Sequence, residues 1–183
     1  MPDPSPVQTP PAVRIRGFAP LARPDARVLI LGSMPSRESL AQHRYYAHPR
    51  NAFWPIITSL LTIDAEGYED RVHRMTARGI AVWDVLRDCV RPGSLDSNID
   101  EKTAVANDFS AFFDVHPGIR RIFFNGAKAE SVYHKRILPS LPANWNALAR
   151  QRLPSTSPAH AGMSLDQKRA AWRAILTPLQ GEG

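Results

Sequence analysis

Four short apolar segments alternate with amphipathic segments along most of this chain. The apolar segments are residues 28–31, 80–82, 121–124 and 147–153, the last of them interrupted by two arginines. Continuous apolar runs of this length are typical of strands buried on both faces of a parallel sheet. Apolar residues at helical spacing predict helices over 53–61, 68–78, 107–114, 126–137 and 164–176. The alternation predicts an α/β fold, a three-layer α/β/α sandwich with a central four-stranded parallel sheet.

The segments outside this pattern set the expected domain boundaries. Residues 1–16 are rich in proline and are expected to form a disordered tail, which leaves 17–183 as a single domain. Residues 86–101 contain Pro-Gly and Ser-Asn pairs and are predicted to be a long irregular connection. Long connections in compact domains are usually functional or mobile.

Composition narrows the class of protein. The 183 residues are 43% hydrophobic and 22% charged, which is ordinary for a soluble globular protein. No apolar run is long enough to span a membrane, and the first residues do not resemble a signal peptide. Cys89 is the only cysteine, so neither an internal disulfide nor a cysteine cage for a metal is possible. We therefore expect a cytoplasmic protein.

The net charge of +6 is unevenly distributed, because basic side chains exceed acidic ones in the first and last thirds of the chain. A basic face built from these two thirds would suit DNA. Mild basicity is also common among soluble proteins, so charge alone leaves both interpretations open.

Candidate chemistry follows the first predicted strand. Gly32-Ser33-Met34-Pro35-Ser36 stands where open α/β sheets bind their ligands. It has neither the lysine of a phosphate-binding P-loop nor the glycines of a dinucleotide fingerprint, which argues against a nucleotide cofactor. The alternative is an ordinary strand-to-helix turn capped by Ser36. A second loop, 45–51, places two tyrosines, a histidine, an arginine and an asparagine before the next helix.

Four blocks of sequence carry a resemblance to a known family. They are LGSMPS at 31–36, YYAHPRNAFW at 45–54, GIAVWDV at 79–85 and LPSTSPAHA at 153–161. In this order they resemble the uracil-DNA glycosylase superfamily, most closely its hypoxanthine (deoxyinosine) DNA glycosylase branch. The resemblance implies a uracil-DNA glycosylase-like fold and a monofunctional glycosylase that hydrolyses deaminated bases from double-stranded or single-stranded DNA. It also implies a monomer that needs no cofactor or metal and is associated with the nucleoid.

The resemblance also suggests which residues are catalytic. Ser33 matches the position where much of the superfamily carries a water-activating aspartate or asparagine, and a serine is a poor general base. Asn51 matches the family's catalytic asparagine in HPRN and is expected to orient the attacking water and contact the departing base. The alternative is that Asn51 only caps the following helix.

Four residues are predicted to bind the base. Tyr46, rather than Tyr45, is expected to stack on an extruded base. Asp84 stands where uracil-specific relatives carry an asparagine, and an ionised carboxylate would accept from N1–H of hypoxanthine and repel a carbonyl oxygen. Alternatively, Asp84 only caps the next segment, or reads uracil in its protonated form. Met34 and Asn125 are expected to form pocket walls, although Asn125 is also a common turn residue.

The block at 153–161 resembles the loop that presses on the DNA strand. Its usual leading histidine or asparagine is replaced by Leu153. Further residues predicted to contact DNA are His48, Arg50, Ser155, Ser157 and His160, with Met163 as a wedge in the space left by the flipped base. Phosphate contacts are also expected among Arg150, Arg152 and Lys168. The alternative is a Ser/Pro-rich linker before a capped helix.

Two other functions remain open. One is a uracil or G·U/G·T mismatch glycosylase of the same fold. The other is a catalytically silent DNA-damage-binding protein, because the aspartate and histidine of the superfamily motifs are missing here. None of the four blocks contains a lysine, which argues against a Schiff-base lyase.

Overall fold

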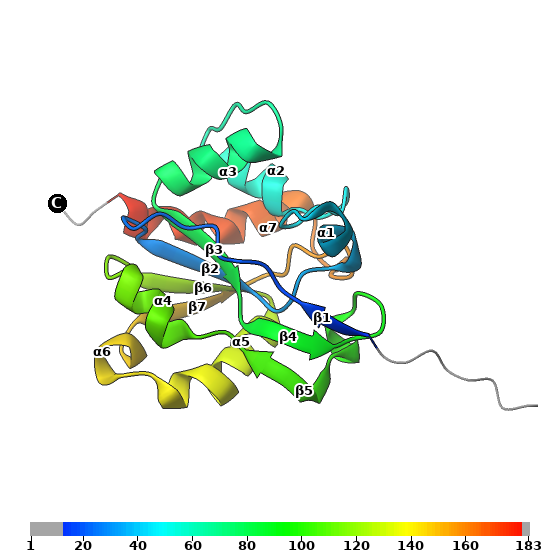
Figure 1. The fold of residues 1–183 in the computed structure, drawn as a ribbon. Helices are drawn as coiled ribbons and strands as arrows, with labels where there is room; N and C mark the ends of the chain where they lie inside the picture. The colour runs from blue at the N-terminus through cyan, green and yellow to red at the C-terminus, as the bar shows by residue number, and fades with distance from the viewer. Residues whose placement is uncertain (1–12, 181–183) are drawn as a thin grey trace, which may run out of the picture.

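A four-stranded parallel sheet forms the centre of the computed structural model, which describes residues 13–180 (Figure 1). The strand order is β3–β2–β6–β7. These strands are β2 (Val28–Gly32), β3 (Ile80–Asp84), β6 (Arg121–Asn125) and β7 (Ala149–Leu153). Each neighbouring pair is parallel, and Gly32 lies opposite Asp84 where β2 and β3 end. The four predicted strands and the expected parallel sheet are confirmed.

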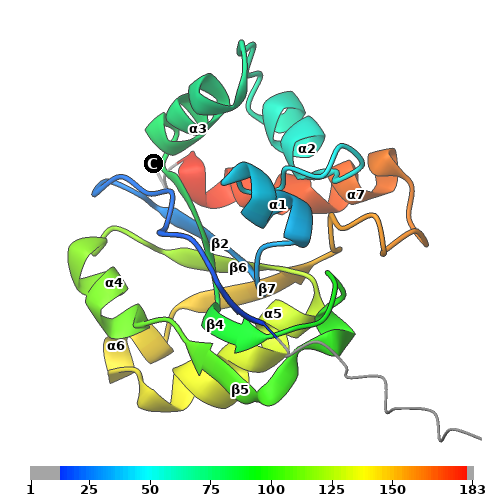
Figure 2. The ribbon, with the colours of Figure 1, turned by 45° about the vertical axis from the view of Figure 1, so that its right-hand side comes forward.

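Helices cover both faces of this sheet and complete the three layers (Figures 1 and 2). One face is covered by α2 (Phe53–Leu60), α3 (Tyr68–Ala77) and α7 (Leu165–Trp172). The other is covered by α4 (Phe109–Val115), α5 (Ala127–Val132), which continues as a π-helical turn over Tyr133–Ile137, and α6 (Ala143–Asn146). A short helix, α1 (Arg37–Gln42), follows β2, and 3-10 turns occupy Asp96–Asn98, Leu138–Ser140 and Arg173–Leu179.

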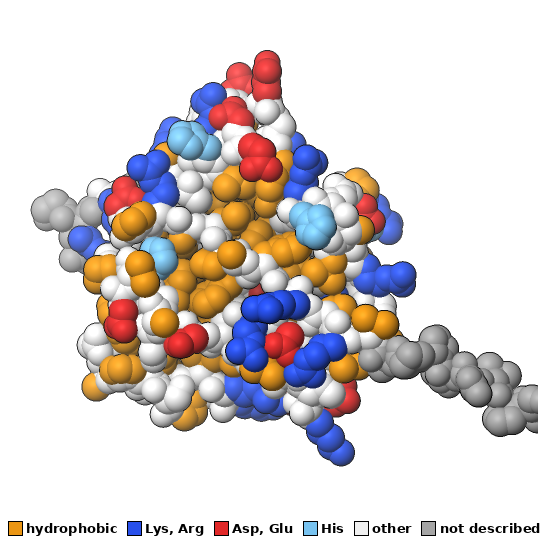
Figure 3. Space-filling model, viewed as in Figure 1, with side chains coloured by type: hydrophobic (Ala, Val, Ile, Leu, Met, Phe, Trp, Pro, Cys, Tyr) orange, Lys and Arg blue, Asp and Glu red, His pale blue; other side chains and the backbone are white. Residues whose placement is uncertain are grey.

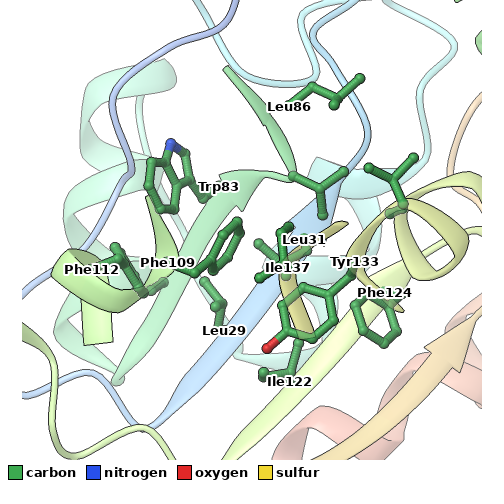
Figure 4. Packing of buried hydrophobic residues seen from close by; sticks show 14 of the residues in the cluster. Leu29, Leu31, Trp83, Leu86, Phe109, Phe112, Ile122, Phe124, Tyr133 and Ile137 are labelled. Atoms are coloured by element: carbon green, nitrogen blue, oxygen red, sulfur yellow. The ribbon is translucent and has the colours of Figure 1, made fainter. Parts of the chain in front are cut away.

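Strands β2 and β3 are almost wholly apolar because both of their faces are buried. Leu29 and Leu31 of β2 pack into one hydrophobic cluster, together with Phe109 of α4 (Figure 4). Val28 and Ile30, the alternate residues of the same strand, pack into a second cluster on the opposite face. Successive side chains of a strand point to opposite faces, so one five-residue strand contributes to both cores.

Short polar side chains fix where several helices begin. Ser164 accepts from the backbone N–H of Gln167, and the Gln167 side chain accepts from the N–H of Ser164, which forms a capping box at the start of α7. Asp108 caps α4 by accepting from the N–H of Ala111. Ser36 caps α1, as expected for the turn after the first strand.

The prediction of an irregular connection over 86–101 is wrong at both ends. Residues Leu86–Val90 form β4 and Asp100–Ala106 form β5, and with β1 (Arg14–Arg16) they make a three-stranded antiparallel sheet of order β1–β4–β5. These strands are buried on one face only, with Leu86 and Cys89 inside and charged residues outside. They therefore lack the apolar runs that marked the central strands. The irregular part is limited to 91–99.

The boundary expected at residue 16 is also too late in the chain, because β1 lies within the proposed tail. Residues 1–12 of that tail are outside the described residues. Among the helices of 13–180, none combines the length and apolar character that crossing a bilayer requires.

Candidate active site

A polar pocket of about 270 Å³ opens at the carboxyl ends of β2, β3 and β6. Ligands of open α/β sheets bind at this edge. The pocket brings together all six residues predicted to be catalytic or base-binding and part of the predicted DNA-contacting loop. Those that line it are Ser33, Met34, Tyr46, Asn51, Asp84, Asn125, Ser155, Ser157 and His160. Segments far apart in the sequence therefore form one site.

Asp84 is the most deeply buried acidic group of this pocket. Its side chain lies over Gly32, so that a Cβ placed on Gly32 would be 2.5 Å from Asp84 Oδ1. The other oxygen, Oδ2, is buried and has no hydrogen-bond partner among the described residues. Burial, reinforced by the charge of Asp96 and opposed by Arg91, raises the pKa of Asp84 to about 7. The expectation of an ionised carboxylate therefore holds only above about pH 7.

Tyr46 borders the pocket from a strained backbone position. Its φ is +56°, a left-handed conformation that non-glycine residues adopt uncommonly. The ring stacks on Phe53 at 3.9 Å between centroids, and its buried hydroxyl has no partner in the described part of the chain. Burial, followed by the charge of Asp84, raises the pKa of Tyr46. Tyr45, by contrast, is only 3% exposed and donates its hydroxyl to the Ala19 carbonyl.

Asn51 has both a structural contact and a free donor. Its Oδ1 accepts from the N–H of Phe53 at 3.0 Å, which supports the first turn of α2, although the N-cap position itself is Ala52. The Asn51 amide nitrogen makes no hydrogen bond to any described residue, and the side chain lines the pocket. The capping role and a role in the pocket are therefore compatible.

Asn125 and Thr156 hold the loop after β7 against the end of β6. Asn125 Oδ1 accepts from the N–H of Thr156 at 2.9 Å, and its Nδ2 donates to Thr156 Oγ1 at 2.8 Å. The carbonyl of Thr156 accepts from the N–H of Ala52 at 3.0 Å. Thr156 is 1% exposed and was not predicted as a site residue. Its three bonds join the predicted DNA-contacting loop to the end of β6 and to the start of α2.

Asp96 and Arg91 are two further residues that the sequence did not single out. Ser33 donates its hydroxyl to Asp96 Oδ1 at 2.6 Å, and both side chains line the pocket. Arg91 is 4% exposed and donates to the carbonyls of Met34 and Pro35. Both residues belong to the 91–99 connection, whose length was the only sequence signal that pointed to them. Through these bonds the connection forms one side of the site.

The other predicted DNA contacts lie beside the pocket or apart from it. Arg50, Met163 and Lys168 line an adjoining cleft of about 350 Å³ that shares Asn51, Ser157 and His160 with the pocket. His48 lines neither hollow, and its Nδ1 accepts from the backbone N–H of Arg50.

Three basic residues expected to contact phosphates already have partners in the protein. Lys168 is buried and donates its Nζ to the carbonyl of His160 at 2.7 Å. Arg150 donates to the carbonyl of Asn146, and Arg152 pairs with Glu130 at 3.2 Å. Lys168 therefore supports the loop after β7.

The small antiparallel sheet brings together charged side chains from different parts of the sequence. Figure 3 shows basic side chains gathered around acidic ones over the small antiparallel sheet. Arg14 of β1 and Arg87 of β4 both pair with Asp88, at 2.6 and 2.9 Å. This group combines the first and middle parts of the chain, and Asp88 neutralises part of its charge.

The fold and the pocket define an α/β protein with a base-sized polar site at the carboxyl edge of its sheet. A sequence profile described as the uracil DNA glycosylase superfamily matches residues 19–177. The match covers most of the chain, which therefore belongs to the uracil DNA glycosylase superfamily.

Individual relatives agree with this assignment. The chain is 34% identical over 135 residues to a hypoxanthine DNA glycosylase of Methanosarcina acetivorans, covering 68% of this chain and 84% of that protein. A hypoxanthine DNA glycosylase of Methanosarcina barkeri is 34% identical over 116 residues, covering 62% of this chain and 72% of the other. A solution NMR structure from M. acetivorans, provisionally described as a uracil DNA glycosylase, matches with a TM-score of 0.76 and 32% identity over 92% of this chain and all of the other.

Gly32→Ala tests the close approach of Asp84 and Tyr46 to the end of β2. The added methyl would lie 2.5 Å from Asp84 Oδ1 and 3.2 Å from Tyr46 Oη. We expect a loss of about 1–3 kcal/mol in the free energy of unfolding, the usual cost of overpacking. Gly162→Ala is the matched control, because no heavy atom lies within 4 Å of its Cβ. Equal denaturation midpoints for the two variants would contradict this packing.

Asp84→Asn tests the raised pKa through stability. The pKa of Asp84 in the folded protein, about 7, lies above the ordinary value of 3.8. The folded protein therefore binds this proton more tightly than the unfolded chain does. The contribution of the protonated Asp84 to the free energy of unfolding is fully present below about pH 4 and is lost as the pH rises through 7. The variant should therefore exceed wild type in unfolding free energy at about pH 8, by at most about 4 kcal/mol. At about pH 4 the two should be equal, and a constant difference across this range would refute the shift.

Proposed function

We propose that this protein is a DNA glycosylase of base-excision repair, which hydrolyses the N-glycosidic bond of deaminated nucleotides, hypoxanthine first and uracil second. The observation that carries the proposal is a base-sized pocket with a buried carboxyl group, in a chain of this superfamily. The preference for hypoxanthine is supported by the names of two relatives.

The pocket has the chemistry to hold an extruded base. A flipped base is read by hydrogen bonds to its edge and by stacking on an aromatic or apolar face. Tyr46, already stacked on Phe53, offers the aromatic surface. Below about pH 7 the neutral Asp84 carboxyl offers one donor and one acceptor. Hypoxanthine and uracil both present an N–H beside a carbonyl, so Asp84 fits both and does not rank them.

Hydrolysis would proceed through an oxocarbenium-like sugar. The free amide donor of Asn51 is suited to hold the attacking water or the departing base in this state. Preorganised donors aimed at developing charge are usually the largest contribution to such catalysis. The adjoining cleft, which Arg50 lines, is suited to the DNA strand that flanks the extruded base.

A single-turnover assay on matched duplexes tests this function. The duplexes carry deoxyinosine, deoxyuridine or an undamaged base at the same position. We expect fastest excision of hypoxanthine, slower excision of uracil and none from the undamaged duplex. Excision of uracil alone would favour a uracil or mismatch glycosylase, and binding without any product would favour a silent damage binder.

Asn51→Ala should lose far more activity than DNA affinity. Removal of one donor to the transition state typically costs on the order of 100-fold in rate. We expect a loss of this size in the single-turnover rate with deoxyinosine, with duplex affinity little changed. A variant with a near-normal rate would assign Asn51 to its contact with Phe53 alone.

The rate of excision should also follow the ionisation of Asp84. As pH rises through about 7 the carboxyl loses its proton and repels the carbonyl of the base. At about pH 8 the wild-type single-turnover rate should be about a tenth of its limiting value. The amide of Asp84→Asn does not ionise, so its rate should stay level over this range. Parallel profiles for the two proteins would remove Asp84 from base recognition.

A further inference from the structure

Among the described residues that line the pocket, two carboxyl groups and the imidazole of His160 can accept a proton, and the His160 side chain is exposed to solvent. Asn51 has an amide, which is not basic, and Ser33 has a hydroxyl that is already used as a donor. The two carboxyl groups are those of Asp84 and Asp96. Asp84 is the more deeply buried of the two and is suited to bind the base.

We propose that Asp96 is the catalytic carboxylate that accepts a proton from the attacking water. Ser33 fixes its Oδ1 by a hydrogen bond of 2.6 Å, which leaves Oδ2 for a water in the pocket. The inference rests on the proposed function. It supplies, from the 91–99 connection, the general base that Ser33 itself cannot provide.

The surroundings of Asp96 favour its charged form more than those of Asp84. Burial raises the pKa of Asp96 above its ordinary value, and the Ser33 hydroxyl, Arg91 and Lys128 oppose part of this shift. For Asp84, burial and the charge of Asp96 both raise the pKa, and only Arg91 lowers it. Two carboxyl groups whose environments differ in this way can serve separately as proton acceptor and as neutral hydrogen-bonding group.

The 91–99 connection is anchored so that Asp96 has a fixed position. Arg91 donates to the carbonyls of Met34, Pro35 and Gly93, which ties the connection to the loop after β2. Ser94 accepts from the N–H of Arg37 at the start of α1. Catalytic groups need such support, because a small displacement lowers the rate strongly.

The step is balanced without a cofactor. The water oxygen bonds to C1′ of the sugar as the bond between C1′ and the base nitrogen breaks, and the bonding electron pair leaves with the base. One water proton passes to Asp96, and the other remains on the new sugar hydroxyl. The departing base takes a proton from solvent, to which Asp96 later returns its own.

Asp96→Asn tests this role by single-turnover excision from a deoxyinosine duplex, with duplex affinity and thermal unfolding measured in parallel. General bases typically contribute roughly 10²–10⁴-fold, so we expect the rate to fall by about 100-fold or more while affinity stays within a few fold. Asp100→Asn is the matched control, since Asp100 is an exposed aspartate at the start of β5, outside the pocket. It should retain the wild-type rate.

A double variant separates proton transfer from a structural role. Combining Ser33→Asp with Asp96→Asn places the carboxylate at position 33 and an amide at position 96. The amide can then donate to the carboxylate, so the two side chains remain hydrogen-bonded. Recovery of at least about tenfold in rate supports a carboxylate requirement at this point.

A near-normal rate for Asp96→Asn, or no recovery in the double variant, would overturn the inference. If wild type releases no base from any lesion duplex, the proposed function itself fails.

Discussion

The burial of the Asp84 carboxyl group over Gly32 is the interaction on which the site depends. Parallel pairing places the ends of β2 and β3 side by side, and only a residue without a side chain leaves room for the carboxyl group between them. An unpaired carboxyl group in such a place is costly when charged, so it holds its proton to about pH 7. The fold thereby keeps a neutral acid in a pocket open to solvent.

Polar bonds help to hold the loops around Asp84 in place. Thr156 and Asn125 join the loop after β7 to β6, and Arg91 joins the 91–99 connection to the loop after β2. Buried polar networks of this kind fix one arrangement when their members are paired. The Asp84 Oδ2 and Tyr46 hydroxyl are the exceptions, buried without a partner among the described residues. Unsatisfied groups at a pocket wall are the groups that a ligand can satisfy.

The sequence was sufficient for the parts of the fold that are buried on both sides. Strands β2, β3 and β6 are mostly apolar, so their places along the chain and the parallel sheet could be predicted. Strands β1, β4 and β5 could not, because their charged outer residues, such as Arg87 and Asp88, hide a one-sided pattern. For the site, residues close to recognisable motifs, such as Tyr46 and Asp84, were found to line one pocket. Asp96 was missed because its contact with Ser33 joins residues 63 positions apart.

A direct titration of Asp84 would test this account most sharply. The side-chain carboxyl carbon of Asp84 can be followed by ¹³C NMR from acidic to alkaline pH in the free protein, with Asp84→Asn used to assign its signal. We expect a midpoint near 7 for Asp84. A midpoint near the ordinary value of 3.8 would mean that the carboxyl group is solvated and charged at neutral pH. The pocket would then lack the neutral acid that the proposed recognition of deaminated bases requires.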